Sequence, residues 1–200
     1  MRRLLRNFIG LSGVLMLTGC GIPHFKSAMP GNIVCNDEFN GVWNLVVPEG
    51  EEMFESGLEF QQTFDCEHSR LRYFSDEDGN LEELIVNYYT VQQGERYFIN
   101  IPISGVVEYA TNGYDYVIFE FKFTRPDLME VALWKNDMLV DLMDNNSLLG
   151  NYKTHNHGVD INIDAGKKKM SELGRRKGLF KWGLVFNKTS SGSELQPTAE

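Results

Sequence analysis

The chain has few cysteines, prolines and histidines, and its acidic side chains far outnumber its basic ones. It holds 3 Cys, 6 Pro and 4 His in 200 residues, and its net charge is −9. An acidic chain is poorly suited to non-specific binding of nucleic acid, because that binding requires cations that neutralise phosphates. No apolar run after residue 17 approaches the roughly 20 residues that a membrane-spanning helix needs. These absences exclude a general nucleic-acid binder and a helical membrane domain.

The familiar catalytic motifs are also missing. The sequence has no Gly-x-Ser-x-Gly elbow, no His-Glu-x-x-His and no phosphate-binding loop. Carboxylates are numerous, but their spacing selects no general acid and base. We therefore expect a protein that is not an enzyme and that uses no cofactor.

The N-terminus is built like a secretory signal. Three arginines within the first six residues precede a charge-free apolar run, Phe8 to Leu17, which ends in Leu17-Thr18-Gly19-Cys20. This ending resembles the lipobox of bacterial lipoproteins, in which the signal is removed before the cysteine and the new terminus is acylated. The resemblance implies a signal peptide over residues 1–19 and lipidation of Cys20. An ordinary signal peptide or a single membrane-spanning helix is the alternative, although the apolar run is short for a span.

An acylated Cys20 would decide where the protein works. Each buried methylene of an acyl chain contributes about 0.8 kcal/mol, and several chains make a stable anchor. Gly21 after the cysteine, rather than Asp, favours the outer membrane in such lipoproteins. We expect a lipid-anchored protein of the bacterial cell envelope, on the outer membrane and facing the periplasm. Without the signal, 16 basic and 28 acidic side chains remain, a net charge of −12.

The rest of the chain is long enough for one domain with its own core. Residues 20–35 contain Gly and Pro but few large apolar side chains, which predicts a tether. We expect a single globular domain over residues 36–188. The polar residues 189–200 are typical of a disordered tail.

Two cysteines remain beside the anchor, Cys35 and Cys66. Disulfides persist outside the cytoplasm, and a bridge between these two would stabilise the fold by about 3–4 kcal/mol. Two separate free thiols are the alternative. Neither cysteine belongs to a Cys-x-x-Cys motif, so a catalytic role is not indicated.

Alternation of apolar and polar residues dominates residues 36–188. It is clearest at residues 58–64, 97–104, 117–124 and 159–164. Turn signals separate these stretches at residues 76–80, 93–94, 111–113 and 125–127. The pattern predicts a mainly β protein whose antiparallel sheet has one face covered, as in a sandwich or barrel.

Two segments depart from this period. Residues 137–149 are compatible with one or two helical turns. Residues 166–180 predict a helix with Met170 and Leu173 on a narrow apolar stripe and Gly178 as a stop. A last strand from Trp182 to Phe186 would follow.

Gly41-Val42-Trp43 matches the Gly-x-Trp opening of lipocalin-like proteins. The later order of elements also resembles bacterial lipoproteins with a small lipocalin-like barrel. The resemblance implies an antiparallel β-barrel with Trp43 on its floor and a short C-terminal helix before the last strand. The motif supports a fold more than a function.

The charges are unevenly distributed. Residues 36–120 carry 18 acidic and 3 basic side chains, whereas residues 121–200 carry 10 acidic and 12 basic. Such asymmetry indicates an interaction surface, here for anionic headgroups or an acidic partner. The alternative is a solvated helix that offsets the acidic half. Seven basic residues cluster late in the chain: Lys167, Lys168, Lys169, Arg175, Arg176, Lys177 and Lys181.

Two short motifs contain residue types that occur in metal sites. His155-Asn156-His157 with Asp160 could ligate a transition metal, but no further ligands stand nearby, and a closed site needs about four. Residues 76–80 resemble the opening of a calcium loop but lack its later Gly and Glu, so a solvated hairpin tip explains them better. We expect no metal.

Two functions remain open. The first is a lipid-anchored binding module whose barrel holds an apolar or lipid-like ligand. The alternative is a non-enzymatic interaction protein that docks onto another envelope component through its acidic face or basic helix. The sequence does not distinguish a barrel with a cavity from one filled by its own side chains.

Overall fold

The computed structural model describes residues 22–46, 55–62, 66, 69–77, 80–103, 113–156 and 158–189. The expected signal peptide and its acylation site Cys20 lie outside the described residues, as does nearly all of the expected tail. No helix of the described part combines the length and apolar character that crossing a membrane demands.

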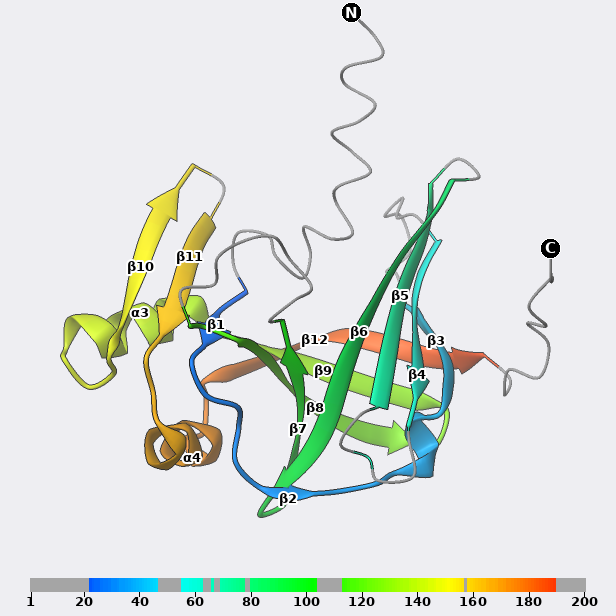
Figure 1. Ribbon diagram of the computed structural model, residues 1–200, viewed down its shortest axis with the longest axis horizontal. Helices are drawn as coiled ribbons and strands as arrows, with labels where there is room; N and C mark the ends of the chain where they lie inside the picture. Colours follow the sequence, from blue (N-terminus) through cyan, green and yellow to red (C-terminus); the bar gives the residue numbers. More distant parts are fainter. Residues whose placement is uncertain are drawn as a thin grey trace, which may run out of the picture.

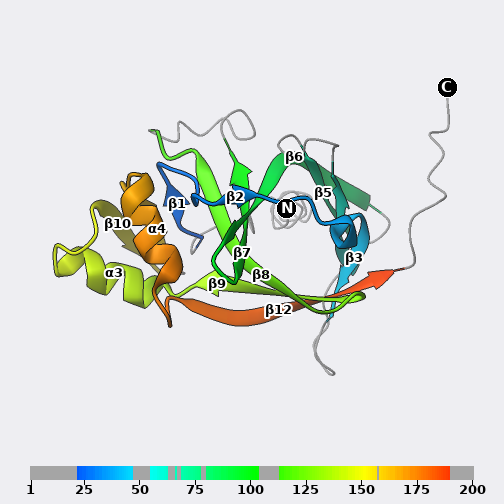
Figure 2. The same ribbon diagram turned by 90° about the horizontal axis from the view of Figure 1, so that it is seen from below.

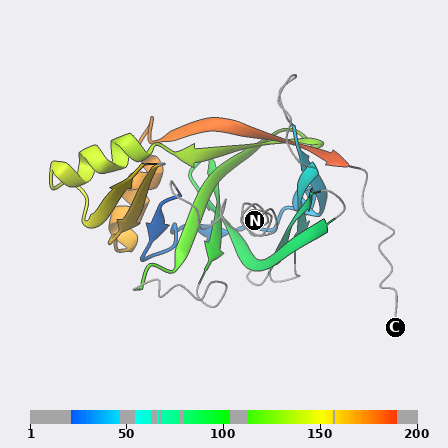
Figure 3. The same ribbon diagram turned by 90° about the horizontal axis from the view of Figure 1, so that it is seen from above.

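Eight of the described strands close into an antiparallel barrel, as Figure 1 and the view from above in Figure 3 show. Each strand pairs with the next along the chain, and the last returns to the first, where Lys188 lies opposite Trp43. The predicted mainly β, barrel-type fold is therefore confirmed. The eight strands are β3 (Gly41–Leu45), β4 (Glu55–Gln61), β5 (Ser69–Glu77), β6 (Asn80–Gln93), β7 (Arg96–Pro102), β8 (Tyr116–Arg125), β9 (Leu128–Trp134) and β12 (Phe180–Thr189).

The period-two pattern places one set of apolar side chains inside the barrel. Tyr97, Ile99 and Ile101 of β7 lie opposite Phe121, Phe119 and Val117 of β8. These residues belong to one interior cluster of side chains, the inner core. Because successive strand residues point to opposite faces, the intervening residues face outward.

One end of the barrel, the closed end, is filled with aromatic rings. A short 3-10 helix, η1 (Asp37–Phe39), begins at Asn36, whose side chain accepts a hydrogen bond from the Glu38 amide. The helix places the Phe39 ring 5.1 Å from Phe60 and 4.5 Å from Phe121. Phe39 is completely buried. Side chains, rather than a cavity, therefore occupy this end.

Trp43 seals the same end. Its indole Nε1 donates to the Phe39 carbonyl at 2.9 Å, and the Lys188 ammonium lies 5.3 Å from its ring centroid. Lys188 also donates to the Glu38 carbonyl at 2.8 Å. Gly41 has φ +127°, and a Cβ there would lie 3.0 Å from the Lys188 side chain. Gly41 thus has a backbone conformation that glycine favours, and the last strand covers the Trp43 ring two residues later.

An insertion between β9 and β12 builds a second layer on one side of the barrel (Figure 2). It contains both segments that were predicted to be helical, and the strand predicted near residue 160 forms one arm of its hairpin. The insertion consists of α3 (Asn136–Asp144), β10 (Gly150–His155), β11 (Gly158–Ile163) and α4 (Lys167–Arg175). α4 stands directly before the last strand, as expected.

Residues 22–35 differ from the expected tether, because they lie along the outside of the barrel. β1 (His24–Phe25) pairs with both β8 and β11, and β2 (Asn32–Ile33) pairs with β6. Between them, the side chain of buried Asn100 exchanges two hydrogen bonds with the backbone of Met29, at 2.8 and 3.2 Å. Strand pairing, these hydrogen bonds and the buried Phe25 and Met29 side chains together dock a segment that is otherwise rich in small and polar residues.

The predicted disulfide is present. Cys35, at the end of this segment, is bridged to Cys66, and their Cα atoms lie 5.5 Å apart. The bond joins the outer segment to the connection between β4 and β5 across a sequence separation of 31. It therefore fixes the start of the barrel to the chain that precedes it.

The insertion and the N-terminal segment bury an outer core against the outward face of β6 to β9. The Trp134 ring lies 4.9 Å from Phe25 and 4.0 Å from Phe180, and its indole donates to the Ile118 carbonyl at 2.7 Å. Met170 and Leu173 of α4 are 0% and 2% exposed in this cluster. The apolar stripe predicted from the sequence is thus the contact surface of α4 with the barrel.

Arg96 holds the C-terminal end of α4. Its guanidinium contacts both carboxylate oxygens of Glu120, at 2.6 and 2.5 Å, and donates to the Gly174 carbonyl. It also lies 4.8 Å from the Phe180 ring centroid. A Cβ at Gly174 would collide with the Gln93 side chain and lie 2.7 Å from the Met29 sulfur. A larger residue at this position would therefore have to displace the ends of the Gln93 and Met29 side chains beneath α4.

Candidate functional site

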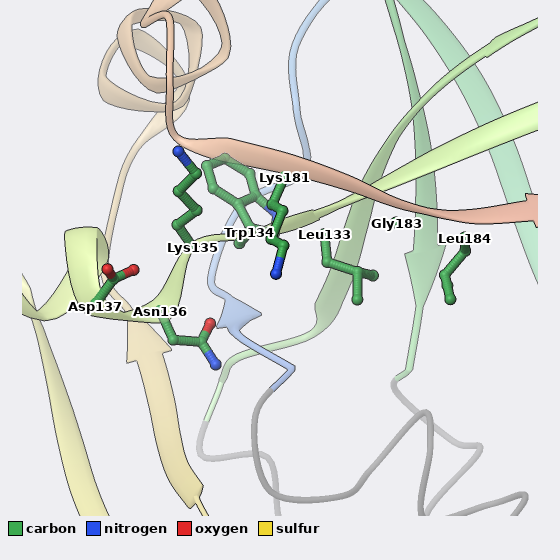
Figure 4. Close-up of a pocket in the computed structure, with 8 residues that line it drawn as sticks. All are labelled: Leu133, Trp134, Lys135, Asn136, Asp137, Lys181, Gly183 and Leu184. Atoms are coloured by element: carbon green, nitrogen blue, oxygen red, sulfur yellow. The ribbon is translucent and has the colours of Figure 1, made fainter. Parts of the chain in front are cut away.

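The opposite end of the barrel, its mouth, carries a pocket of about 620 Å³. The pocket lies where β9 ends, α3 begins and β12 starts, and it is lined by Leu133, Trp134, Lys135, Asn136, Asp137, Lys181, Gly183 and Leu184. Figure 4 shows these side chains. Its volume is within the range of small-molecule sites.

The inward-facing residues of β9 and β12 form the apolar part of this pocket. Leu133 follows Met129 and Val131 in the alternation of β9, and Leu184 pairs with Val131. Leu133 and Leu184 are only half-buried, whereas Met129 and Val131, deeper in the barrel, are 0% and 5% exposed. Leu133 and Leu184 thus lie at the rim of the barrel interior, and the pocket also borders Trp134 of the outer core.

Lys181 shares this face. It pairs with Leu133, and a bulge between Trp182 and Leu184 brings Leu184 back to the same side. In Figure 4 the side chains of Lys181, Leu133 and Leu184 point to one side of the β9–β12 pair, and Lys135 points to the other. Lys181 was expected to belong to the basic helix, but it lies on β12, at the mouth.

The other six residues of the predicted basic cluster lie at the two ends of α4. Lys167, Lys168 and Lys169 occupy its first turn, and Arg175, Arg176 and Lys177 follow at its C-terminal end. Lys169 pairs with Glu172 at 3.1 Å, and Arg175 donates to the Ser171 hydroxyl at 2.8 Å. The cluster is therefore two short cationic patches joined by a helix that also carries an acid.

The histidine motif forms a contact within the β10–β11 hairpin. The His155 Nε2 and a carboxylate oxygen of Asp160 lie 2.6 Å apart, and His157 is outside the described residues. Within the described ranges, no three His, Cys, Asp or Glu side chains gather as a metal site would require. At the other candidate metal motif, Glu77 pairs with Asn80, which makes it the tip of the β5–β6 hairpin.

Burial shifts the pKa of several groups near the two cores. Burial raises the pKa of Tyr88 in the inner core well above its usual range, and the neighbouring Ser69 and Gln62 side chains act in the opposite direction. On the outer face, burial and the neighbouring Tyr116 raise the pKa of Tyr89 to about 12. Burial lowers the pKa of His24, although Asp160 acts in the opposite direction. Each of these shifts favours the neutral form of a packed side chain.

Sequence reasoning missed the mouth pocket. Alternation along β9 could have placed Leu133 inside. It could not have placed Lys181, because strict alternation puts Lys181 with Gly183 and Val185 and separates it from Leu184. Only the bulge restores the common face.

Comparison of the chain with protein-family models, with curated proteins and with solved structures found no match.

Proposed function

We propose that this protein is a lipid-anchored binding module of the bacterial envelope, and that the mouth of its barrel holds an apolar or lipid-like ligand. The pocket at the mouth carries this proposal. It is lined by Leu133 and Leu184 and lies at the end of the barrel opposite Phe39 and Trp43. An apolar lining at the mouth suits a ligand with an apolar end that binds there.

The anchor part of the proposal rests on the N-terminal sequence. Residues 1–19 have the features of a signal peptide, and Cys20 stands where lipoproteins are acylated. Lipidation would hold the barrel at a membrane surface, close to a supply of amphiphiles. The acidic mature chain and its disulfide are compatible with the periplasm.

The ligand can be sought by extracting the purified protein with organic solvent. Mass spectrometry of the extracted lipids then tests whether the protein carries a lipid-like ligand. Extraction removes a non-covalent ligand and leaves acyl chains on Cys20 attached. We expect about one ligand per chain, lost when Leu133 and Leu184 are both replaced by Gln. Leu149→Gln is the control, because Leu149 is 71% exposed on the insertion. Extracts with no more lipid than those of an unrelated lipoprotein would overturn the binding function.

A second test addresses the anchor. Cys20→Ser should release the protein from membranes or stop its processing, and it should abolish labelling by a palmitate analogue. Labelling that persists in Cys20→Ser would overturn the lipidation site.

A docking role through α4 is the second candidate. Within the described part of the chain, Lys167, Lys168, Arg176 and Lys177 have no carboxylate partner, and all four are exposed. If these cations bind anionic headgroups, the Cys20→Ser protein should sediment with anionic vesicles and not with neutral ones, and salt should reverse the binding. Equal sedimentation with both kinds of vesicle would exclude this role.

A further inference from the structure

We propose that Lys181 makes the mouth pocket selective for amphiphiles with an anionic headgroup. This inference rests on the proposed ligand-binding function and adds the chemistry of the ligand's polar end. The apolar chain would lie against Leu133 and Leu184, and the headgroup would meet the Lys181 ammonium.

The position of Lys181 is the first argument. An inward-facing position on a barrel strand normally carries an apolar residue, as Val131 and Phe186 do deeper in the same two strands. Lys181 takes this position at the outermost inward-facing level, beside Leu133. A lysine there can lay its methylene stem along apolar surface and keep its ammonium at the opening.

The lack of a partner is the second argument. In the described part of the structure, no carboxylate forms an ion pair with Lys181. By contrast, Lys122 on the outer face pairs with Glu130 at 2.8 Å and lies 4.4 Å from the Trp182 ring centroid. Lys181 is exposed at the opening, and without an anionic partner its ammonium is available to a ligand.

The remaining charges at the pocket are few. Lys135 also lines the pocket, but its side chain points to the opposite side of the strand pair in Figure 4, so Lys181 is the lysine on the side of Leu133 and Leu184. Asp137 is exposed in the first turn of α3, and no side chain caps that helix start. The uncapped amide groups at the N-terminus of α3 carry partial positive charge. This charge offsets the Asp137 carboxylate and stabilises an anion nearby.

Three ligands that share a C18 chain and differ in their headgroup distinguish the contribution of the headgroup to affinity from that of the chain. Oleate, oleyl alcohol and oleylamine carry negative, zero and positive charge, and calorimetry below their aggregation concentrations measures each affinity. We expect the protein to bind oleate about five- to tenfold more tightly than oleyl alcohol, and oleylamine most weakly.

Substitutions assign this preference to one residue. Lys181→Gln should abolish the preference for oleate and leave binding of oleyl alcohol unchanged, and Lys181→Arg should retain the preference. Lys122→Gln, which removes the same charge from the outer face, should also retain it. Unchanged thermal midpoints would show that these variants fold.

The outcomes distinguish the two proposals. Equal affinity of the unsubstituted protein for oleate and oleyl alcohol, or a preference that survives Lys181→Gln, would overturn the role of Lys181 and leave the pocket intact. Failure of all three ligands to bind the unsubstituted protein would overturn the pocket itself.

Discussion

The molecule contains two apolar cores that are built on opposite faces of the same strands. The inner core lies inside the barrel and is enclosed by the closed sheet, with η1 adding Phe39 at the closed end. The outer core lies on the outside of β6 to β9 and is buried only because the insertion and residues 22–35 cover it. The same sheet therefore carries one core that lies within the barrel and a second core that added segments cover.

In the outer core, side-chain hydrogen bonds attach the covering segments to the barrel. Asn100 and Arg96 sit on the outward face, and their hydrogen bonds hold the Met29 backbone and the end of α4. In the inner core, apolar side chains pack against one another, and the Trp43 indole donates to the Phe39 carbonyl within the same end. The difference follows from geometry, since barrel closure pairs the backbone of every strand, whereas added segments bring unpaired polar groups to the surface that they cover.

The largest expected effect is loss of Trp43 from the inner core. Trp43→Ala would remove a fully buried ring and its hydrogen bond to Phe39, and should lower the free energy of unfolding by about 3–5 kcal/mol. Urea denaturation followed by circular dichroism measures this. Trp182→Ala is the matched control and should lower it by less than about 1 kcal/mol, because Trp182 is 38% exposed. Equal losses would mean that the closed end is not packed as described.

A smaller effect is expected from Arg96 in the outer core. Arg96→Met leaves the Glu120 carboxylate, 8% exposed, without its cation under α4, and should destabilise by about 2–3 kcal/mol. Hydrogen exchange should show protection lost first in α4. Replacing Glu120 by Gln in the same variant should recover part of the stability.

The matched control for Arg96 is a second ion pair, Arg72 with Glu59 at 3.0 Å. Arg72→Met should cost about 1 kcal/mol or less, since its carboxylate is 19% exposed. If both variants lose the same stability, cover by α4 is not what strengthens the Arg96 pair.

The smallest effect concerns His24 at the edge of the outer core. Burial lowers the pKa of His24, so the unfolded chain binds a proton more readily than the folded one. The free energy of unfolding should therefore fall as the pH is lowered through the ordinary histidine range. Above that range, the contribution of neutral His24 should be fully present. His24→Gln should reduce the loss of thermal midpoint between pH 7 and pH 5. A loss that is unchanged in His24→Gln would assign the pH dependence to other groups.

The two cores also differ in how far the sequence predicted them. Alternation in β7 and β8 predicted that Ile99 and Phe119 lie on a covered face of a sheet, and the resemblance to lipocalin-like proteins implied that Trp43 lies at one end of a barrel. The outer core left a weaker signal. The Met170 and Leu173 stripe predicted that α4 would pack, but nothing in residues 22–35 distinguished a docked segment from a tether. Phe25 and Met29 are isolated in a run of small and polar residues, so no period shows their burial.

By itself, the sequence determined a mainly β sheet with one covered face and the helix before the last strand, and it favoured the disulfide. The barrel was implied by the Gly-x-Trp resemblance. The sheet and the helix depend on local periodicity, and the disulfide depends on Cys35 and Cys66 being the two cysteines that remain beside Cys20. The tertiary structure alone decided which end of the barrel is filled, where residues 22–35 lie and on which side Lys181 stands. These depend on contacts between segments far apart in the chain and on one bulge between Trp182 and Leu184. A single extra residue in a strand reverses the side chains that follow, and no local pattern records that reversal.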